Sequence, residues 1–249
     1  MPADAPNRQL KTIRYLNVVA VAMVALYIFW PSGPRAVRGP GDRSVMCRNR
    51  MREIATALLH YESVRGEFPP AVVTDENGKP MHSWRVLIMP YMERKDVYDA
   101  YDFDEPWDGP NNRKLAEKVN LEFFHCPSTE RSDDDGTTDY VLVVGPEAIF
   151  DVGKSVSQSF LAEHDGADST IMLIETKNSG IHWMEPRDLT IDEAVKSISP
   201  GGQGTNHTNS INVAFAGGSV RRLSTDATPE TFRALLTAAG GETLDEDAY

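Results

Sequence analysis

An uncharged apolar run near the start of the chain constrains its fold most. Residues 15–30 read YLNVVAVAMVALYIFW, and Asn17 is the single polar amide among them. A helix of this length spans about 24 Å, less than the roughly 30 Å of a bilayer's hydrocarbon core. Adding Ile13 and Arg14, whose long side chain can reach the interface, gives a short but sufficient span. The run therefore favours a single membrane anchor, in which residues 1–30 form a cytoplasmic tail and a transmembrane helix that Pro31 ends.

A cleaved signal peptide is the alternative for the same run. Basic residues precede it, but Pro31, Pro34 and Arg35 interrupt the small residues where a cleavage site would lie. Orientation is not fixed by the basic residues, because Arg35, Arg38 and Arg43 follow the run closely. The short N-terminal tail favours a single-pass protein of the inner membrane whose C-terminal domain lies outside the cytoplasm.

Charge is distributed unevenly along the chain. The formal net charge is −12, yet residues 1–52 hold nine Lys or Arg and two acidic residues. The remaining residues hold 16 basic and 35 acidic side chains. A basic segment beside an acidic body suits a protein that lies against anionic lipid. It argues against nucleic acid as a partner, because the body lacks the basic face that phosphate contacts require.

Proline and glycine separate the anchor from the rest of the chain. Residues 31–42 read PSGPRAVRGPGD, so we assign residues 31–43 to a linker and residues 44–249 to one domain. A helix is expected from Ser44 to Arg65, ended by Gly66, with an apolar stripe at helical spacing. Two short helical pieces, interrupted at Pro90, are expected between Trp84 and Tyr101, and another helix over 111–118.

Strand patterns occur later in the chain. Runs rich in β-branched and aliphatic residues lie at 140–145, 170–175, 211–216 and 219–223. Gly217 and Gly218 predict a two-residue type I′ turn between the last two, because both can adopt positive φ. Thr228 and Pro229 predict the start of a closing helix over 230–239, with Gly240 as its stop. The order predicts an α+β fold, with a long helix packed on an antiparallel sheet and a C-terminal helix.

Residues suited to metal binding or catalysis are few. An acidic stretch at 133–139 offers Asp133, Asp135 and Asp139 as weak candidates for Ca²⁺, although its spacing does not fit an EF-hand; a solvated acidic turn is the alternative. A second weak cation candidate is the group of Glu163, Asp165 and Asp168. No H-E-x-x-H, P-loop or G-x-S-x-G pattern is present. We therefore expect no enzyme activity, no catalytic residues and no cofactor.

The chain has two cysteines, Cys47 and Cys126. Outside the cytoplasm they could form a disulfide that closes a loop of about 80 residues and contributes about 4 kcal/mol. Two unpaired buried thiols are the alternative.

A series of short motifs, taken together and in order, resembles the DUF1559 family, which is abundant in planctomycetes and distantly similar to type II secretion pseudopilins. The matching segments are 47–51 with the helix to Tyr61, 66–70, 84–87, 90–93, 106–112, 126–128, 165–175, 183–189, 207–220 and 234–241. The resemblance implies a pseudopilin-like fold and carries no established activity.

Two features depart from these families. Gly217-Gly218 stands where DUF1559 has Asp-Gly after a histidine, here His207. The pseudopilin processing motif is absent, and residues 31–41 break the continuous helix on which a pilus filament depends. The sequence thus favours a non-enzymatic, membrane-tethered envelope domain that contacts the lipid bilayer and unidentified envelope proteins. A calcium- or small-ligand-binding module is the alternative.

Overall fold

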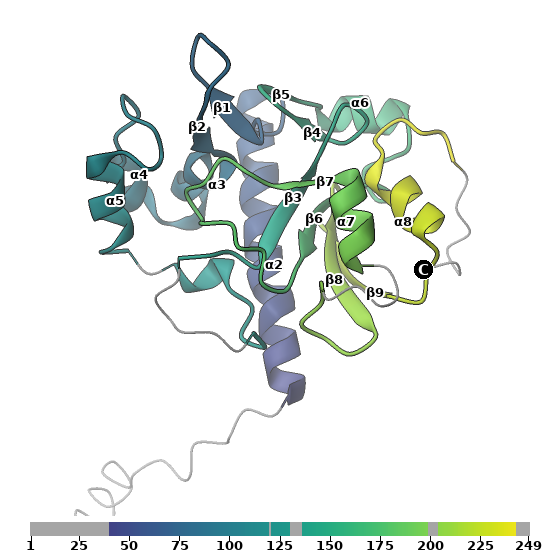
Figure 1. Ribbon diagram of the computed structural model, residues 1–249. Helices are drawn as coiled ribbons and strands as arrows, with labels where there is room; N and C mark the ends of the chain where they lie inside the picture. Colours follow the sequence, from purple (N-terminus) through teal and green to yellow (C-terminus); the bar gives the residue numbers. More distant parts are fainter. Residues whose placement is uncertain (1–39, 120, 130–135, 199–203, 243–249) are drawn as a thin grey trace, which may run out of the picture. The chain divides into compact units, whose positions relative to one another are not determined.

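The computed structural model describes residues 40–119, 121–129, 136–198 and 204–242 (Figure 1). The chain divides into two units, residues 1–38 and 39–249, and every described residue belongs to the second. The predicted anchor over 15–30 and most of the predicted linker lie outside these ranges. Within them, none of the helices has both the length and the apolar character needed to cross a bilayer.

The long helix α2 (Pro40–Arg65) begins four residues before the predicted Ser44. The linker prediction was wrong here, because a proline in the first turn of a helix gives up an N–H that has no partner within the helix. The C-terminal end was predicted correctly: Gly66 adopts a φ of 87° and its N–H donates to the carbonyl of Glu62 at 2.7 Å. The predicted stripe includes Met51, which is buried.

Short elements follow α2 and form one side of the domain. They are β1 (Val72–Thr74), β2 (Pro80–Ser83), α3 (Trp84–Leu87), η1 (Met89–Met92), α4 (Lys95–Ala100), α5 (Pro110–Ala116) and η2 (Glu122–Phe124). The segment from Trp84 to Tyr101 therefore contains three helical pieces rather than two, and Pro90 lies inside η1 as one of its first residues. The β1–β2 hairpin had no counterpart in the sequence prediction.

The second half of the chain builds a seven-stranded sheet. Its strands are β3 (Tyr140–Val144), β4 (Phe150–Asp151), β5 (Lys154–Ser155), β6 (Ile171–Glu175), β7 (Leu189–Thr190), β8 (Ser210–Phe215) and β9 (Val220–Ser224). Three helices accompany them: α6 (Gln158–Glu163), α7 (Ile191–Ile198) and α8 (Pro229–Leu236). The strand order is β5-β4-β3-β6-β8-β9, with β7 also pairing with β3.

The sheet is mixed, whereas the sequence predicted an antiparallel one. The four longer strands β3, β6, β8 and β9 pair antiparallel, as predicted. However, β4 and β7 both pair with β3 in parallel. The chain between β3 and β7 supplies the long connection that parallel pairing usually needs, whereas β4 follows β3 after five residues and pairs with it only at Val144 and Phe150.

Alternation along the strands gives the sheet two buried faces. Tyr140 and Leu142 point into a cluster with α2, while Val141 and Val143 point into a second cluster with α7 and α8. Figure 1 shows α2 on one side of the sheet and α7 with α8 on the other. The predicted α+β class is confirmed, and its C-terminal helix packs on the face opposite to the long helix.

The β8–β9 connection differs from the predicted type I′ turn. Gly218 adopts a φ of 90°, whereas Gly217 is not among the residues with positive φ. Phe215 N donates to the carbonyl of Ser219 at 2.9 Å and Gly218 N to that of Phe215 at 2.8 Å, which gives a three-residue loop. A loop of this length needs left-handed backbone at one position only.

The closing helix was predicted at its start but not at its end. The side chain of Thr228 accepts a hydrogen bond from Thr231 N, and Pro229 occupies the first turn. The helix ends at Leu236 instead of 239, because Thr237 adopts extended backbone and Ala238 N donates to the carbonyl of Glu147 at 2.8 Å. The structure therefore does not use Gly240 as the helix stop.

Candidate functional site

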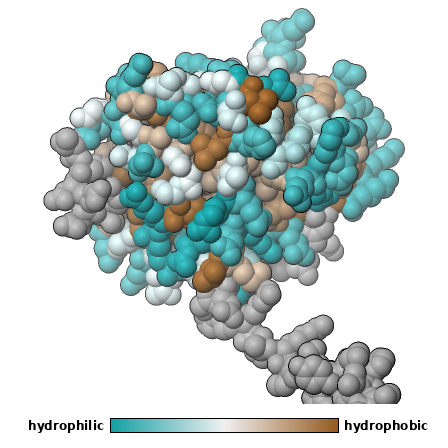
Figure 2. All heavy atoms as spheres, turned by 180° about the vertical axis from the view of Figure 1, so that it is seen from behind, coloured by the Kyte–Doolittle hydropathy of each residue, from teal (hydrophilic) through white to brown (hydrophobic). Residues whose placement is uncertain are grey.

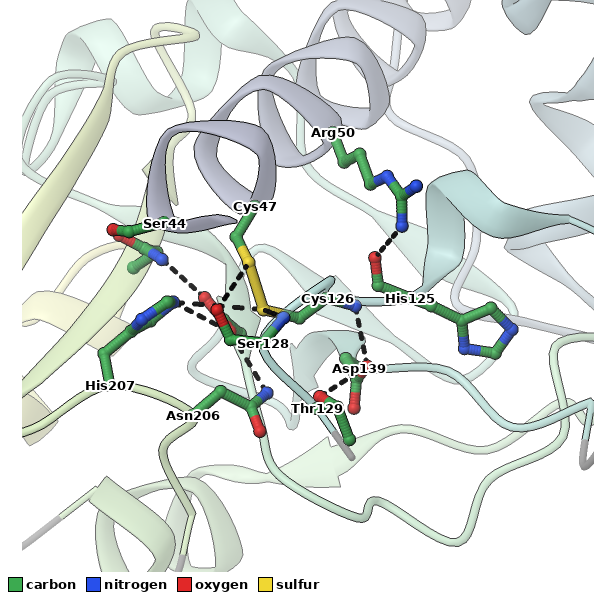
Figure 3. The surroundings of a disulfide bond; sticks show 12 residues. Ser44, Cys47, Arg50, His125, Cys126, Ser128, Thr129, Asp139, Asn206 and His207 are labelled. Carbon is green, nitrogen blue, oxygen red and sulfur yellow. Dashed lines mark hydrogen bonds and ion pairs between the residues drawn. A yellow bond between two sulfur atoms is a disulfide. The ribbon is translucent and has the colours of Figure 1, made fainter. Parts of the chain in front are cut away.

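A disulfide between Cys47 and Cys126 joins α2 to the loop after η2 (Figure 3). The two Cα atoms are 5.0 Å apart, within the usual range for a bridge, and the residues are 79 positions apart in sequence. Both cysteines are buried. Of the two alternatives that the sequence left open, the structure contains the bridge.

Two further side chains with metal-binding chemistry lie beside the disulfide. His207 Nε2 is 3.9 Å from Cys126 Sγ and 3.2 Å from Glu175 Oε1. Glu175 is 1% exposed and the His207 side chain 8%. Figure 3 shows His207 directed at the bridge from the segment before β8. The structure thus brings together residues from four separate segments of the chain.

Strand alternation explains how Glu175 comes to face the disulfide. It ends β6 opposite Tyr140 of β3, whose side chain also points toward α2 and donates to the carbonyl of Cys47 at 3.0 Å. Asn212 of β8 occupies the same face, between Ile211 and Val213, which face α7 and α8. Local sequence patterns therefore determine the face, and the strand register places the residues side by side.

Amide and hydroxyl groups hold the cluster in place. Asn212 Nδ2 donates to Glu175 Oε2 at 2.5 Å, and Asn206 Nδ2 donates to Oε1 at 3.1 Å. The backbone N–H of Ser128 points at Cys126 Sγ, with the nitrogen 3.4 Å from the sulfur. These contacts fix the positions of the carboxylate and the sulfur before any ligand arrives.

Asp139, one of the calcium candidates in the acidic stretch at 133–139, lies in the interior of the domain. It is buried, and its Oδ2 accepts hydrogen bonds from Cys126 N at 2.7 Å and from Thr129 Oγ1 at 3.1 Å. Asp139 therefore positions the loop that carries Cys126. Asp133 and Asp135 lie outside the described residues.

The second acidic candidate group is divided among separate contacts. The carboxylate of Asp165 accepts hydrogen bonds from Gly240 N at 2.7 Å and Gly241 N at 2.9 Å. Asp168 lies against Gly217, where an added Cβ would overlap its Oδ1. The carboxylate of Asp168 thus lies where a side chain at position 217 would begin.

A buried ion pair lies at the edge of β3. Arg85 Nη2 and Asp188 Oδ1 are 2.6 Å apart, and both side chains are fully buried. Arg85 Nη2 also donates to the carbonyl of Tyr140 at 3.3 Å, and Asp188 Oδ1 accepts from Leu142 N at 2.9 Å. The pair therefore satisfies backbone groups of β3 that a neighbouring strand would otherwise satisfy.

Burial dominates the electrostatics of this pair. It raises the pKa of Asp188 to about 6, while Arg85 and the hydrogen bonds from Leu142 N and from Trp84 Nε1 at 2.9 Å lower it. The same burial lowers the pKa of Arg85, against the attraction of Asp188. Sequence analysis did not predict this pair, whose members come from the matching segments 84–87 and 183–189.

The outer surface has a groove beside α2. It has a volume of 660 Å³ and is lined by residues of α2, of η1 and its following residue, and of η2: Asn49, Arg52, Glu53, Thr56, Tyr91, Met92, Glu93 and Phe123. Figure 2, which views the molecule from the side opposite to Figure 1, shows a mostly hydrophilic face with small, separate hydrophobic patches. Glu175, Asp139 and the Arg85–Asp188 pair are buried and do not contribute to this surface.

Among the described residues, one group of His, Cys, Asp and Glu side chains gathers its ligand atoms within 4.8 Å of one another: Cys47, Cys126, Glu175 and His207. The sequence offers the cysteines, since the chain has only two. For their neighbours the sequence gives one local signal, the acidic Glu175 at the end of an apolar run, and none for His207, because no fixed spacing links these residues.

Comparison with known proteins places this architecture in a family. Proteins of unknown function described as DUF1559 match residues 42–190, more than half of the chain. The match includes both cysteines, Glu175 and the Arg85–Asp188 pair, and it ends before His207. No curated protein and no solved structure matches. The chain belongs to the DUF1559 family.

Proposed function

We propose that this protein is a non-enzymatic domain of the cell envelope, tethered to the inner membrane through residues 15–30 and exposed outside the cytoplasm. Its role is structural, exerted through contacts with the bilayer and with other envelope proteins. The buried disulfide between Cys47 and Cys126 carries the proposal. Disulfides form and persist in oxidising compartments and are rare where thiols are kept reduced.

The use made of the ionisable groups supports a structural role. Asp188 is fully buried and neutralises Arg85 while completing the edge of β3. Asp139 holds the loop that carries Cys126. These ionisable side chains hold separate segments of the chain together inside the domain.

Topology and thiol state can be measured together on the full chain in its membrane. We expect protease added outside the cytoplasmic membrane to digest the domain, and intact mass to show residues 1–249 joined. Because both cysteines are buried, a charged maleimide is added in denaturant, where it should label no thiol before reduction and two after it. A domain protected on the cytoplasmic side with two free thiols, or a product beginning beyond residue 30, would contradict the proposal.

A calcium titration separates this proposal from that of a cation-binding module. We expect the Tm of the full chain to be the same in Ca²⁺ and in a chelator. A calcium-dependent rise in Tm that the double substitution Asp133→Asn, Asp135→Asn abolishes would favour the module instead.

A further inference from the structure

Beyond a structural role, we propose that reduction of the Cys47–Cys126 disulfide converts its surroundings into a zinc site. Its ligands are Cys47 Sγ, Cys126 Sγ, His207 Nε2 and Glu175 Oε1. These four atoms already lie within 4.8 Å of one another in the buried interior. Two thiolates, one imidazole and one carboxylate form a donor set that zinc accepts.

The distances fit a tetrahedral ion. With ordinary Zn–S, Zn–N and Zn–O bonds, a tetrahedron places sulfur about 3.6 Å from nitrogen and nitrogen about 3.4 Å from oxygen. The corresponding distances are 3.9 Å for Cys126 Sγ to His207 Nε2 and 3.2 Å for His207 Nε2 to Glu175 Oε1. The two sulfurs must separate, which breaking their covalent bond permits, and the other pairs of ligand atoms already lie within 4.8 Å of one another.

The groups around the four ligands suit such a site. Asn206 and Asn212 donate to the two oxygens of Glu175, so the carboxylate is oriented from behind. Ser128 N–H points at Cys126 Sγ and would stabilise negative charge on a thiolate. Cys47, Cys126 and Glu175 are buried, and the side chain of His207 is 8% exposed, so little of the site faces water.

The conversion balances as follows. A dithiol reductant transfers two electrons and two protons to the disulfide, becoming a disulfide itself and leaving Cys47 and Cys126 as thiols. Zn²⁺ then replaces the two thiol protons, which pass to water, while His207 binds as the neutral imidazole. The disulfide and the zinc-bound dithiolate are therefore mutually exclusive states of the same two residues.

Cobalt provides a spectroscopic test on the full chain in detergent micelles. After anaerobic reduction with a phosphine, we expect one equivalent of Co²⁺ to bind with thiolate-to-cobalt charge-transfer bands and tetrahedral d–d bands. Zn²⁺ should displace it, and the oxidised protein should show neither band. Absence of these bands from the reduced, folded protein would overturn the proposal.

Matched variants decide which residues are ligands. His207→Gln and Glu175→Gln should each weaken Co²⁺ binding at least tenfold and alter the d–d bands, and Cys47→Ser should abolish the charge-transfer bands. His164→Gln, at an exposed position, is the control and should bind as the wild type does. Equal affinity in the wild type, His207→Gln and Glu175→Gln would show adventitious binding by the cysteines alone.

A second measurement covers the case in which reduction unfolds the domain. Zn²⁺ added before the reductant should preserve the far-UV circular dichroism and slow alkylation of both thiols at least tenfold. Alkylation at the same rate with and without Zn²⁺ would contradict the proposal even if the reduced chain is unfolded.

Discussion

The two faces of the sheet are stabilised in different ways. On the α7–α8 face, strands and helices meet through apolar side chains, such as Val213, Phe232 and Leu235. On the α2 face, the apolar cluster is joined by a disulfide and by the buried polar cluster around Glu175, and an ion pair closes the nearby edge of β3. Apolar packing tolerates gradual change, whereas paired polar groups fail when one partner is lost.

The largest effect is expected from separating the buried ion pair. Asp188→Leu leaves Arg85 charged, buried and without its counterion, and should lower the free energy of unfolding by about 5 kcal/mol. The double variant Arg85→Met, Asp188→Leu should recover the part of that loss that comes from the unpaired charge, but not the part that comes from the lost hydrogen bonds to Tyr140 O, Leu142 N and Trp84 Nε1. Urea unfolding of Asp188→Leu, Arg85→Met and the double variant measures the three losses, and a double variant whose loss equals the sum of the two single losses would remove the distinction between the two faces.

Removal of the disulfide should rank next. Cys47→Ala with Cys126→Ala releases a loop of 79 residues and should lower the free energy of unfolding by about 4 kcal/mol. The expected change in the denaturation midpoint should match that of the reduced wild type in the absence of metal. A loss of unfolding free energy smaller than about 1 kcal/mol would mean that the apolar and polar contacts hold α2 to the sheet without the bridge.

The apolar face should respond in proportion to the atoms removed. Leu235→Ala in α8 leaves a cavity and should cost about 3 kcal/mol, with Leu235→Met costing less than about 1.5 kcal/mol. Thermal unfolding of both variants measures this gradation. If Leu235→Met lowered the stability as much as Leu235→Ala, the packing on this face would also depend on the exact shape of its side chains.

A smaller effect is expected at the β8–β9 loop. Gly217→Ala places a Cβ against Asp168 Oδ1, and because that carboxylate can rotate away the cost should be about 1 kcal/mol. Gly217→Asp should cost more, because it sets two carboxylates side by side. Adding Asp168→Ala should relieve that repulsion. A double variant no more stable than Gly217→Asp would show that the two carboxylates do not repel each other.

The smallest effect concerns pH. Burial lowers the pKa of His82, whose Nδ1 lies 3.0 Å from Tyr101 Oη. The unfolded chain, with an ordinary pKa of about 6.5, then binds the proton more readily than the folded one. Stability from this group is present above that value and is lost as the pH falls through the lower folded pKa.

The check for His82 compares two pH profiles. Between pH 7 and 5, the wild type should lose stability relative to His82→Asn, so the difference in unfolding free energy between them narrows as acid is added. A constant difference over this range would show that His82 does not titrate differently in the two states.

Much of the fold is visible in the sequence where a pattern extends over several turns or residues. The stripe of α2, the runs of β3, β6 and β8, and the Thr228 cap all led to the correct element. Helix α7 was missed, although Thr190 and Glu193 form a reciprocal capping box and the buried residues recur at helical spacing. The two-residue strands β4, β5 and β7 are too short to carry any periodicity.

Sequence patterns predicted only part of the candidate site, for a physical reason. Cys47 and Cys126 could be paired by count alone, because the chain has no other cysteine. Glu175, His207 and the pair Arg85–Asp188 meet through strand register and loop paths, which local patterns do not specify. A charged residue at the end of an otherwise apolar strand, as Glu175 is after Ile171–Ile174, was the one available signal.

The bridge also determines how the domain would bear a pulling force. With Cys47 near the beginning of α2, tension entering through residue 40 passes across the bridge to Cys126 instead of along the intervening chain. At about 3.6 Å per extended residue, the 79 enclosed positions represent roughly 280 Å of contour length. That length is withheld from extension while the disulfide is intact and released when it is reduced, so redox state would decide how far the domain stretches before it is fully unravelled.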